Sequence, residues 1–307
     1  MILSIIIVNW NSGKQLETCV NSICHAAALL NAEWEVIVVD NASSDDSLSR
    51  ISKMRGDLTL LKNSQNRGFA AACNQGAILA KGRYLLFLNP DTRLLPNSLE
   101  KPISFMEAKA SHGIGICGIR LLDAVGNTST CASRFPGVRV MVGSLLGLSV
   151  CFPRLFPSHL MRPAELETNQ FVDQVTGAYF LVRRKVFDAC GGFDERFFVY
   201  YEEVDFSLRA LKQGFSSYLL ADVAAFHRGG GCSEQVKATR LFYSLRSRIQ
   251  YANKHFSIVE KAGLWLVMAI EFPARIVRAV IHASPTEVRD SVAAYILLAR
   301  YYLQRQL

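Results

Sequence analysis

The fold is decided by the stretch ILSIIIVNWNSGKQLETCVNSICHAAALLNAEWEVIVVDN, residues 2–41. Residues 2–9 form a continuous apolar run of strand length, rich in β-branched side chains, as a buried parallel strand requires. Residues 14–30 then have helical spacing, and one face carries Leu16, Val20, Ile23 and Ala27. A second buried strand follows at residues 34–41. A strand, a helix and a strand in this order imply a right-handed crossover and a parallel sheet.

The same alternation continues, with strands expected at residues 58–63 and 84–91 and an Ala-rich helix at residues 68–80. We therefore expect an α/β fold with a mostly parallel sheet flanked by helices. Ligands of such sheets bind beyond the carboxyl ends of the strands. Those ends carry a set of polar side chains: Asn9, Asn11, Asp40, Asn41, Asn89 and Asp91.

The rhythm breaks at residues 123–172, which mix apolar residues, arginine and proline and predict an insertion over the sheet. Strand, helix and loop patterns return at residues 174–231, and the chain is largely helical from residue 234 onward. The expected organisation is a sheet domain over residues 1–233, interrupted by the insertion, and a helical region over residues 234–307.

Composition sets the broad class. Half of the 307 residues are hydrophobic and a fifth are charged, which excludes a disordered chain and a small disulfide scaffold. The eight cysteines form no CxxC pair and no signal peptide is evident, so we expect a reducing, cytoplasmic compartment.

The net charge of +8 falls entirely within residues 208–307. Such an asymmetry suggests a polyanion or an anionic membrane surface as partner, while the simpler interpretation is a solubilising surface. Residues 262–281 are apolar but interrupted by Glu271, Pro273, Arg275 and Arg278, which argues for an amphipathic surface helix rather than a spanning one. An ordinary helical pair packed on the core is the alternative.

Four groups of residues could carry chemistry, and three of them are Asp91, the acids at 202–205 and His227. An apolar strand delivers Asp91 of the triplet NPD to the sheet edge, where a divalent cation needs carboxylate oxygen, although Asn-Pro-Asp is also good turn chemistry. The stretch YYEEVDFSLR brings Glu202, Glu203 and Asp205 to a helix start, where acidic residues are common in any case. Its aromatic flanks could raise a carboxyl pKa toward that of a general base. His227, just before a glycine run, is either structural or a metal or phosphate ligand.

Asp40, at the end of IVVD, could accept hydrogen bonds from a nucleobase or ribose. Neither GxGxxG nor GxxxxGK[ST] occurs, which counts against a dinucleotide-binding or P-loop enzyme.

Together these segments resemble a family 2 glycosyltransferase, closest to the rhamnosyltransferase-like bacterial branch. The resemblance rests on IIIVNWNSGKQLETCVNSI, VIVVDNASSDDS, NRGFAAACNQGA, YLLFLNPDT, VTGAYFLVRRKVFDACGGFDERFFVYYEEVDFSLR and the His227 loop, in the family's order over residues 2–255. It implies a GT-A fold, a nucleotide-diphosphate sugar donor, a divalent cation (Mn²⁺ or Mg²⁺) and inversion at the anomeric carbon.

By position, Asp91 corresponds to the last acid of the family's DxD motif and Asn89 replaces the first. His227 matches a histidine that completes the metal site in some relatives. The resemblance implies donor-binding roles for Asn9, Asn11, Asp40, Asn66, Arg67, Gly68, Asn89 and Asp91. It places Gly177, Ala178 and Asp205 on the acceptor side. Glu203 stands where the family has its catalytic Asp, with Glu202 as the alternative base.

The expected function is transfer of a sugar, with a leaning to rhamnose, to a glycan or lipid-linked saccharide in cell-surface polysaccharide synthesis, at the inner face of the cell membrane. Three rivals differ from it. A non-catalytic nucleotide-sugar binder would explain the missing first Asp of DxD. A nucleotidyltransferase needs a basic glycine-rich loop where residues 9–13 read NWNSG. A nucleic-acid-binding protein is suggested only by the basic tail, which lacks a recognition motif.

Overall fold

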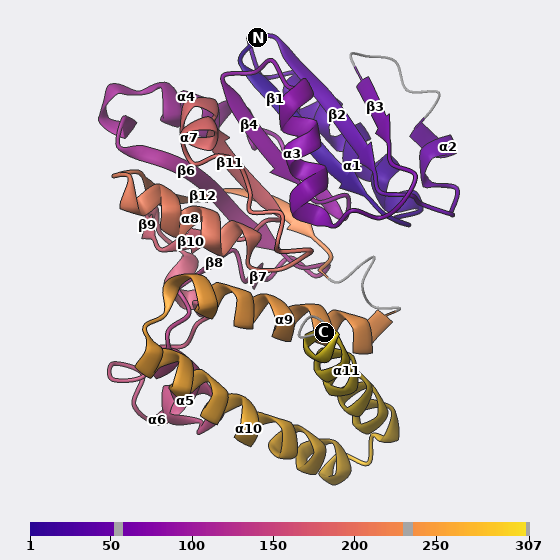
Figure 1. The fold of residues 1–307 in the computed structure, drawn as a ribbon. Helices are drawn as coiled ribbons and strands as arrows, with labels where there is room; N and C mark the ends of the chain where they lie inside the picture. Colours follow the sequence, from indigo (N-terminus) through magenta and orange to yellow (C-terminus); the bar gives the residue numbers. More distant parts are fainter. Residues whose placement is uncertain (52–57, 230–235, 305–307) are drawn as a thin grey trace. The chain divides into compact units, whose positions relative to one another are not determined.

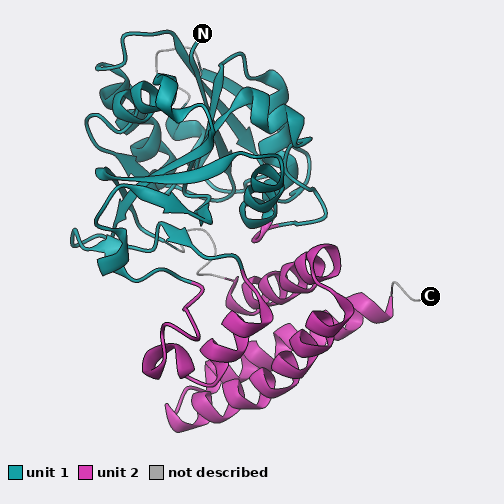
Figure 2. Cartoon of the chain, turned by 90° about the vertical axis from the view of Figure 1, so that its left-hand side faces the viewer, with its two compact units in different colours: residues 1–135, 160–198, 202–232 teal, residues 136–159, 199–201, 233–307 magenta. Residues whose placement is uncertain are grey.

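The computed structural model describes residues 1–51, 58–229 and 236–304. The chain divides into two compact units, drawn in different colours in Figure 2. The first, here called the sheet unit, comprises residues 1–135, 160–198 and 202–232. The second, the helical unit, comprises residues 136–159, 199–201 and 233–307. Half of the expected insertion thus groups with the C-terminal helices.

In the described part of the sheet unit, ten strands form one sheet, whose main path runs β3-β2-β1-β4-β11-β6-β12-β5. The first four along this path are β3 (Leu58–Lys62), β2 (Trp34–Asp40), β1 (Leu3–Asn9) and β4 (Tyr84–Leu88). They are mutually parallel, as the strand–helix alternation predicts. The other four are β11 (Tyr179–Arg183), β6 (Ile114–Leu122), β12 (Ser216–His227) and β5 (Thr92–Leu94).

The second half of the sheet is mixed. Strand β11 is antiparallel to both β4 and β6, while β6 and β12 are parallel. Short strands β7 (Thr128–Ser129) and β9 (Gln170–Val172) extend it, and β8 (Ala132–Ser133) pairs with β10 (Gln174–Val175) in a separate ladder. The right-handed crossover that places successive strands parallel does not apply to β11, because the chain reaches β11 through the insertion rather than through a single helix.

Helices cover both faces of the sheet (Figure 1). One face packs on α1 (Lys14–Ala27) and α4 (Glu100–Glu107), and the other on α3 (Phe69–Leu79), α7 (Arg184–Ala189) and α8 (Glu202–Lys212). Short helices α2 (Ser47–Ile51), η1 (Lys109–Ser111) and η2 (Pro163–Leu166) lie in connections. The alternation of β1 explains both layers, since Leu3, Ile5 and Ile7 face one cluster and Ile6 and Val8 the other.

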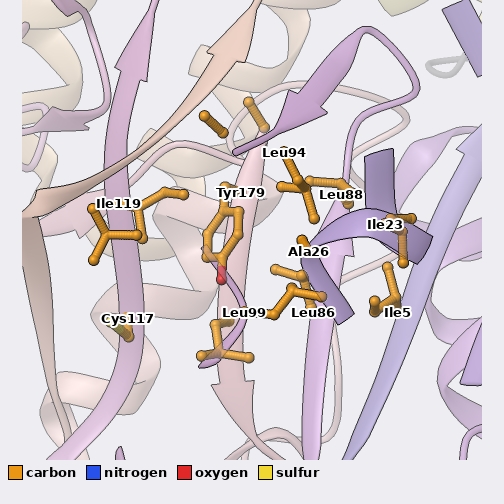
Figure 3. Close-up of a cluster of buried hydrophobic side chains, with 14 of the residues drawn as sticks. Ile5, Ile23, Ala26, Leu86, Leu88, Leu94, Leu99, Cys117, Ile119 and Tyr179 are labelled. Atoms are coloured by element: carbon orange, nitrogen blue, oxygen red, sulfur yellow. The ribbon is translucent and has the colours of Figure 1, made fainter. Parts of the chain in front are cut away.

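The core under α1 is drawn in Figure 3, where the ring of Tyr179 lies between Ile119 and Leu88. Tyr179 is 2% exposed, and its hydroxyl donates to the carbonyl of Ser98 at 2.6 Å, so the buried polar atom is satisfied. Four apolar positions expected on one helix face, Leu16, Val20, Ile23 and Ala27, are all buried.

The helical unit contains α5 (Val138–Leu145), α6 (Leu148–Cys151), α9 (Lys237–His255), α10 (Ile258–Ile281) and α11 (Pro285–Leu303). The expected amphipathic segment 262–281 lies within α10, which begins with a capping box between Ser257 and Glu260. Across the residues that the structure describes, no helix combines the length and the apolarity that a membrane crossing requires.

Candidate active site

The carboxyl ends of β1 and β2 meet in register, with Asn9 opposite Asp40. The side-chain amide of Asn9 donates to Asp40 Oδ1 at 2.8 Å and to the hydroxyl of Ser47 at 2.8 Å, and the hydroxyl of Ser12 donates to Asn9 Oδ1. Asn9 is fully buried and Asp40 is 4% exposed. Asn9 therefore fixes the carboxylate of Asp40.

The loops after these strands are held by side chains. The backbone N–H of Ser43 donates to Asp40 Oδ2 at 3.2 Å, and the N–H of Ser44 donates to Asn11 Oδ1 at 2.8 Å. Asn11 and Ala42 have φ of +50° and +63°, a left-handed conformation that is uncommon outside glycine. Each carboxylate oxygen of Asp40 accepts one of these hydrogen bonds and has capacity for a second, so Asp40 could also accept from a donor group of a ligand.

The NRG segment forms a tight turn against the loop before α8. Asn41 accepts from the N–H of Arg67 at 3.2 Å and donates to the carbonyl of Gly68 at 3.0 Å. Gly68 has φ of +89°, and a Cβ there would lie 2.6 Å from the Phe198 carbonyl oxygen. The N–H of Phe69 donates to that oxygen at 2.6 Å. Glycine is therefore required at position 68.

Arg67 is exposed and Asn66 is half-buried, with Asn66 Oδ1 accepting from the N–H of Gly68 at 2.9 Å. The turn thus places the exposed guanidinium of Arg67 next to Gly68, whose backbone conformation requires glycine. Such an arrangement suits close approach by an anionic ligand.

The NPD triplet and the end of β12 come together. Strand β5 pairs antiparallel with β12, with Thr92 opposite His227. His227 Nε2 lies 3.3 Å from Asp91 Oδ1, and the two side chains are 17% and 8% exposed. The sequence separates these residues by more than a hundred positions, and the sheet brings them into contact. The glycines that follow at positions 230–231 lie outside the described residues.

This pair fits a divalent cation in its chemistry. A carboxylate oxygen and an imidazole nitrogen are both ligands of Mn²⁺, and a site with few protein ligands leaves positions for phosphate oxygens and water. No cluster of three or more His, Cys, Asp or Glu with metal-binding geometry occurs among the described residues. A metal held here would therefore depend on the substrate for the rest of its coordination.

The TGA segment is tied to the NPD turn. The carbonyl of Ala178 accepts from the N–H of Asn89 at 3.2 Å and from Thr92 Oγ1 at 3.3 Å. Gly177, next to it, has no atom within 4 Å of the position that a Cβ would take. The structure thus leaves space beside Gly177 at the same edge as Asp91.

The first turn of α8 holds the glutamate pair. Glu202 is 5% exposed, and Oε2 of both Glu202 and Glu203 is buried without a hydrogen-bond partner among the described residues. Burial and the charge of Glu203 raise the pKa of Glu202 well above its ordinary value, and burial raises the pKa of Glu203. The preceding Tyr200 and Tyr201 have φ of +68° and +70°, and such costly conformations in bulky residues are concentrated at functional sites.

Asp205, the third acid of this helix, is differently placed. It is fully buried, and its Oδ2 accepts from Arg209 Nε at 2.7 Å. Arg209 also donates to the carbonyls of Cys190 and Gly192. This arrangement anchors α8 to the loop that precedes it.

Sequence reasoning missed Asn74, on α3. Its side chain accepts from the N–H of Phe193 at 2.9 Å and donates to the Phe193 carbonyl at 2.8 Å, so it holds the loop that leads into α8. A polar side chain within the Ala-rich helix was the only signal. Asn63 and Gln75 were missed as well, and they exchange two amide hydrogen bonds beside Asn41.

Comparison with known proteins agrees with this geometry. Residues 4–136 match the family described as Glycosyl transferase family 2. The chain is 26% identical over 239 residues to the N-acetylglucosaminyl-diphospho-decaprenol L-rhamnosyltransferase of Mycobacterium tuberculosis, an alignment that covers 74% of this chain and 76% of that protein. It is 25% identical over 256 residues to the low-salt glycan biosynthesis hexosyltransferase Agl10 of Haloferax volcanii, covering 82% of this chain and 74% of that one.

Solved structures share the fold at low identity. One is the mannosyltransferase PcManGT from Pyrobaculum calidifontis, in complex with GDP-Man and Mn²⁺, with a TM-score of 0.56 at 16% identity. The match covers 97% of this chain and 75% of the PcManGT chain. TarS 1–349 from S. aureus, in complex with UDP, has a TM-score of 0.54 at 17% identity and covers 99% and 92%. The expected GT-A fold and the resemblance to the rhamnosyltransferase-like branch of the family are confirmed.

Proposed function

Because the chain is a family 2 glycosyltransferase with a GT-A fold, we propose that it moves a hexose from a nucleotide-diphosphate donor to a hydroxyl of a glycan or lipid-linked saccharide, with inversion. Rhamnose is the favoured sugar, since a relative over most of the chain is a rhamnosyltransferase that acts on a diphospho-decaprenol acceptor. The reaction would be a step of cell-surface polysaccharide synthesis, and the protein would bind peripherally to the inner face of the cell membrane.

Two groups of side chains in the sheet unit support the proposal. Asp91 and His227 are in contact and mostly buried. Glu202 is buried and Glu203 half-buried; both have a raised pKa, and Oε2 of each is buried without a hydrogen-bond partner in the part of the chain that the structure describes. A hexosyl transfer needs both functions, a place for the diphosphate and a base for the acceptor.

In the proposed reaction, Glu203 accepts the proton of the acceptor hydroxyl. The acceptor oxygen forms a bond to the anomeric carbon while the bond from that carbon to the diphosphate oxygen breaks on the opposite face. A raised pKa makes the carboxylate a stronger base than an ordinary glutamate, and burial excludes water that would compete with the acceptor. Glu202 is the alternative base.

The donor would be bound by the residues on the loops after β1, β2 and β3. Asp40 would accept from the nucleobase, with Asn9 and Asn11 holding its loop, and Asn66, Arg67 and Gly68 would lie beside the base and the diphosphate. Asp91 and His227 would hold a Mn²⁺ or Mg²⁺ ion, with Asn89 next to it. When bound, such an ion neutralises charge on the leaving diphosphate.

The acceptor would enter on the side of Gly177 and Ala178, where the position of a Cβ on Gly177 has open space around it. Asp205 would contribute by tying α8, which carries the glutamate pair, through Arg209 to the loop that precedes the helix.

A non-catalytic nucleotide-sugar-binding protein is the second candidate, favoured by Asn89 in place of the first acid of DxD. It would bind a donor without consuming it, so donor turnover separates the two functions.

The direct test is thermal stabilisation by UDP, dTDP and GDP, each with and without Mn²⁺, on the wild type and on Asp91→Ala. We expect one nucleotide to stabilise the wild type in a metal-dependent way, and Asp91→Ala to lose the metal-dependent part. Ligand at a hundred times its Kd stabilises by about 2.7 kcal/mol, which a melting curve resolves easily. Absence of metal-dependent stabilisation by all three would refute the donor site as described.

A further inference from the structure

Helix α10 presents apolar side chains to solvent in addition to the apolar side chains that it buries in the helical unit, Leu264, Val267 and Met268. A surface helix of a globular protein normally turns its apolar stripe to the core and its charges to water. In α10, however, all exposed residues except Glu260 and Arg278 are apolar. The large exposed apolar side chains are Ile258, Val259, Trp265, Leu266, Ile270, Val277, Val280 and Ile281.

These side chains form one continuous stripe. Their spacing of three and four residues, completed by Ala262, Ala269 and Pro273, keeps them on one face for the whole helix. With 24 residues, α10 presents a stripe of about 36 Å. Leu266 and Val280 are each 64% exposed, so the apolar surface is open to solvent within the described chain.

The charges of α10 are used inside the helical unit. Glu271 accepts from Arg248 of α9 at 2.6 Å and from Arg275 at 2.6 Å. Burial alone would raise the pKa of Glu271, but the two guanidiniums hold that pKa below its ordinary value. Glu271, Arg275 and Arg278 also line a cavity of about 710 Å³ within the same unit. Glu271 and Arg275 are therefore partnered within the helical unit, and Glu260 and Arg278 are the charged side chains among the exposed residues of α10.

We propose that this outward stripe of α10 docks flat on a phospholipid bilayer with anionic head groups. The choice of a membrane rests in part on the proposed function, whose acceptor can be lipid-linked. An amphipathic helix lying in the interface buries its apolar face about 5–10 Å deep, and a tryptophan such as Trp265, 53% exposed, is a typical interfacial anchor.

Charge decides between a membrane and a second copy of this chain. By sequence, the helical unit contains 13 basic and 5 acidic residues, whereas the sheet unit is neutral. A homodimer through α10 would bring together two helical units of net charge +8 each, which repel each other. An anionic bilayer satisfies the apolar stripe and the positive charge together.

The test is flotation of the full chain with vesicles of phosphatidylglycerol and phosphatidylcholine, and with phosphatidylcholine alone. Leu266→Glu/Val280→Glu places two charges on the stripe. Ile78→Glu/Val125→Glu is the matched control, because it makes the same charge change at positions of the sheet unit that are 78% and 83% exposed. All four positions lie at the surface, so both variants should fold, as melting curves would verify.

We expect the wild type and the control to float with anionic vesicles, and the stripe variant to lose about tenfold or more in vesicle affinity, since its apolar face can no longer enter the interface. Brominated lipid should quench the fluorescence of the wild type and do so less in Trp265→Phe. Equal flotation of wild type and stripe variant, or none by the wild type, would overturn the proposal. A wild-type dimer in light scattering that the stripe variant breaks would also overturn it.

Nucleotide-dependent thermal stabilisation, measured on the same proteins, keeps the two proposals apart. The stripe variant should retain it, because no donor residue is changed. If the stripe variant loses flotation but keeps nucleotide-dependent stabilisation, the substitutions have disrupted membrane binding alone. If the wild type floats but no nucleotide stabilises it, the result contradicts the proposed donor site and not the membrane-binding surface.

Discussion

Replacing Glu203 by glutamine removes the proposed base without changing its shape. The side chain lies in the first turn of α8, and its Oε2 is buried without a partner among the described residues. Glutamine is isosteric and cannot accept a proton. Since the substitution keeps the shape of the side chain and Glu203 has no salt bridge among the described residues, the fold and the binding of nucleotide should survive the change.

The expected loss follows from the role. A positioned general base contributes roughly 10²–10⁴-fold. That range corresponds to about 2.7–5.5 kcal/mol of transition-state stabilisation. Burial raises the pKa of Glu203, and the base acts only when it is ionised. The wild type should therefore need a higher pH for full activity than an enzyme whose base is a glutamate with an ordinary pKa. Activity should therefore fall as the pH drops through that raised pKa.

The assay is release of nucleoside diphosphate from the donor in the presence of acceptor, with kcat and the KM for donor measured separately. Glu202→Gln is the matched control, at the neighbouring position and with the same change of charge. We expect a large fall in kcat with little change in the KM for donor in Glu203→Gln. If Glu202→Gln shows that fall instead, the base is Glu202. Wild-type turnover in both variants would refute the assignment of the glutamate pair.

Three further outcomes follow from the structure. Gly68→Ala should weaken nucleotide-dependent stabilisation, because its Cβ would lie 2.6 Å from the Phe198 carbonyl oxygen at a φ of +89°; unchanged stabilisation would contradict this packing. Arg209→Met should cost about 3–5 kcal/mol in urea unfolding, since it removes the guanidinium that binds a fully buried carboxylate. Arg196→Met, where the guanidinium is 68% exposed, should cost less than about 1 kcal/mol. The pKa of Glu202 is raised in the folded state, so wild-type stability should fall as the pH increases. Glu202→Gln lacks this dependence, and its melting temperature relative to wild type should therefore rise from pH 5 to pH 8. A difference in melting temperature that does not change with pH would refute the raised pKa.

The parallel half of the sheet could be predicted from the sequence, because buried parallel strands are continuous apolar runs. Strands β1, β2 and β3 begin and end within one residue of the predicted ranges 2–9, 34–41 and 58–63. The strand predicted at 84–91 ends at Leu88, since Pro90 cannot donate to a ladder. Strand β6 was not predicted, because its glycines interrupt the apolar run, and they are needed where Val175 and Phe215 pack closely.

Contacts between distant segments could not be predicted from single motifs. The proximity of Asp91 and His227 depends on the pairing of β5 with β12, which has no local signature. Likewise, the sequence indicated three acids at a helix start, but only packing distinguishes Asp205, which is paired with Arg209, from Glu202 and Glu203, which retain unpartnered oxygens. The roles expected for these residues came from the resemblance to family 2 glycosyltransferases, because the periodicity of apolar residues predicts helices and strands but no chemical role.

The measurement that tests the central claim most directly is sugar transfer itself. The full chain would be incubated with Mn²⁺, a panel of UDP-, dTDP- and GDP-sugars and a saccharide linked to a lipid diphosphate, and the product would be examined by mass spectrometry and by NMR of the anomeric proton. We predict that one donor class is consumed, that the new linkage has inverted configuration, and that Asp91→Ala and Glu203→Gln both lose transfer. A donor that is bound but never consumed, or transfer that is unaffected by either substitution, would contradict the account.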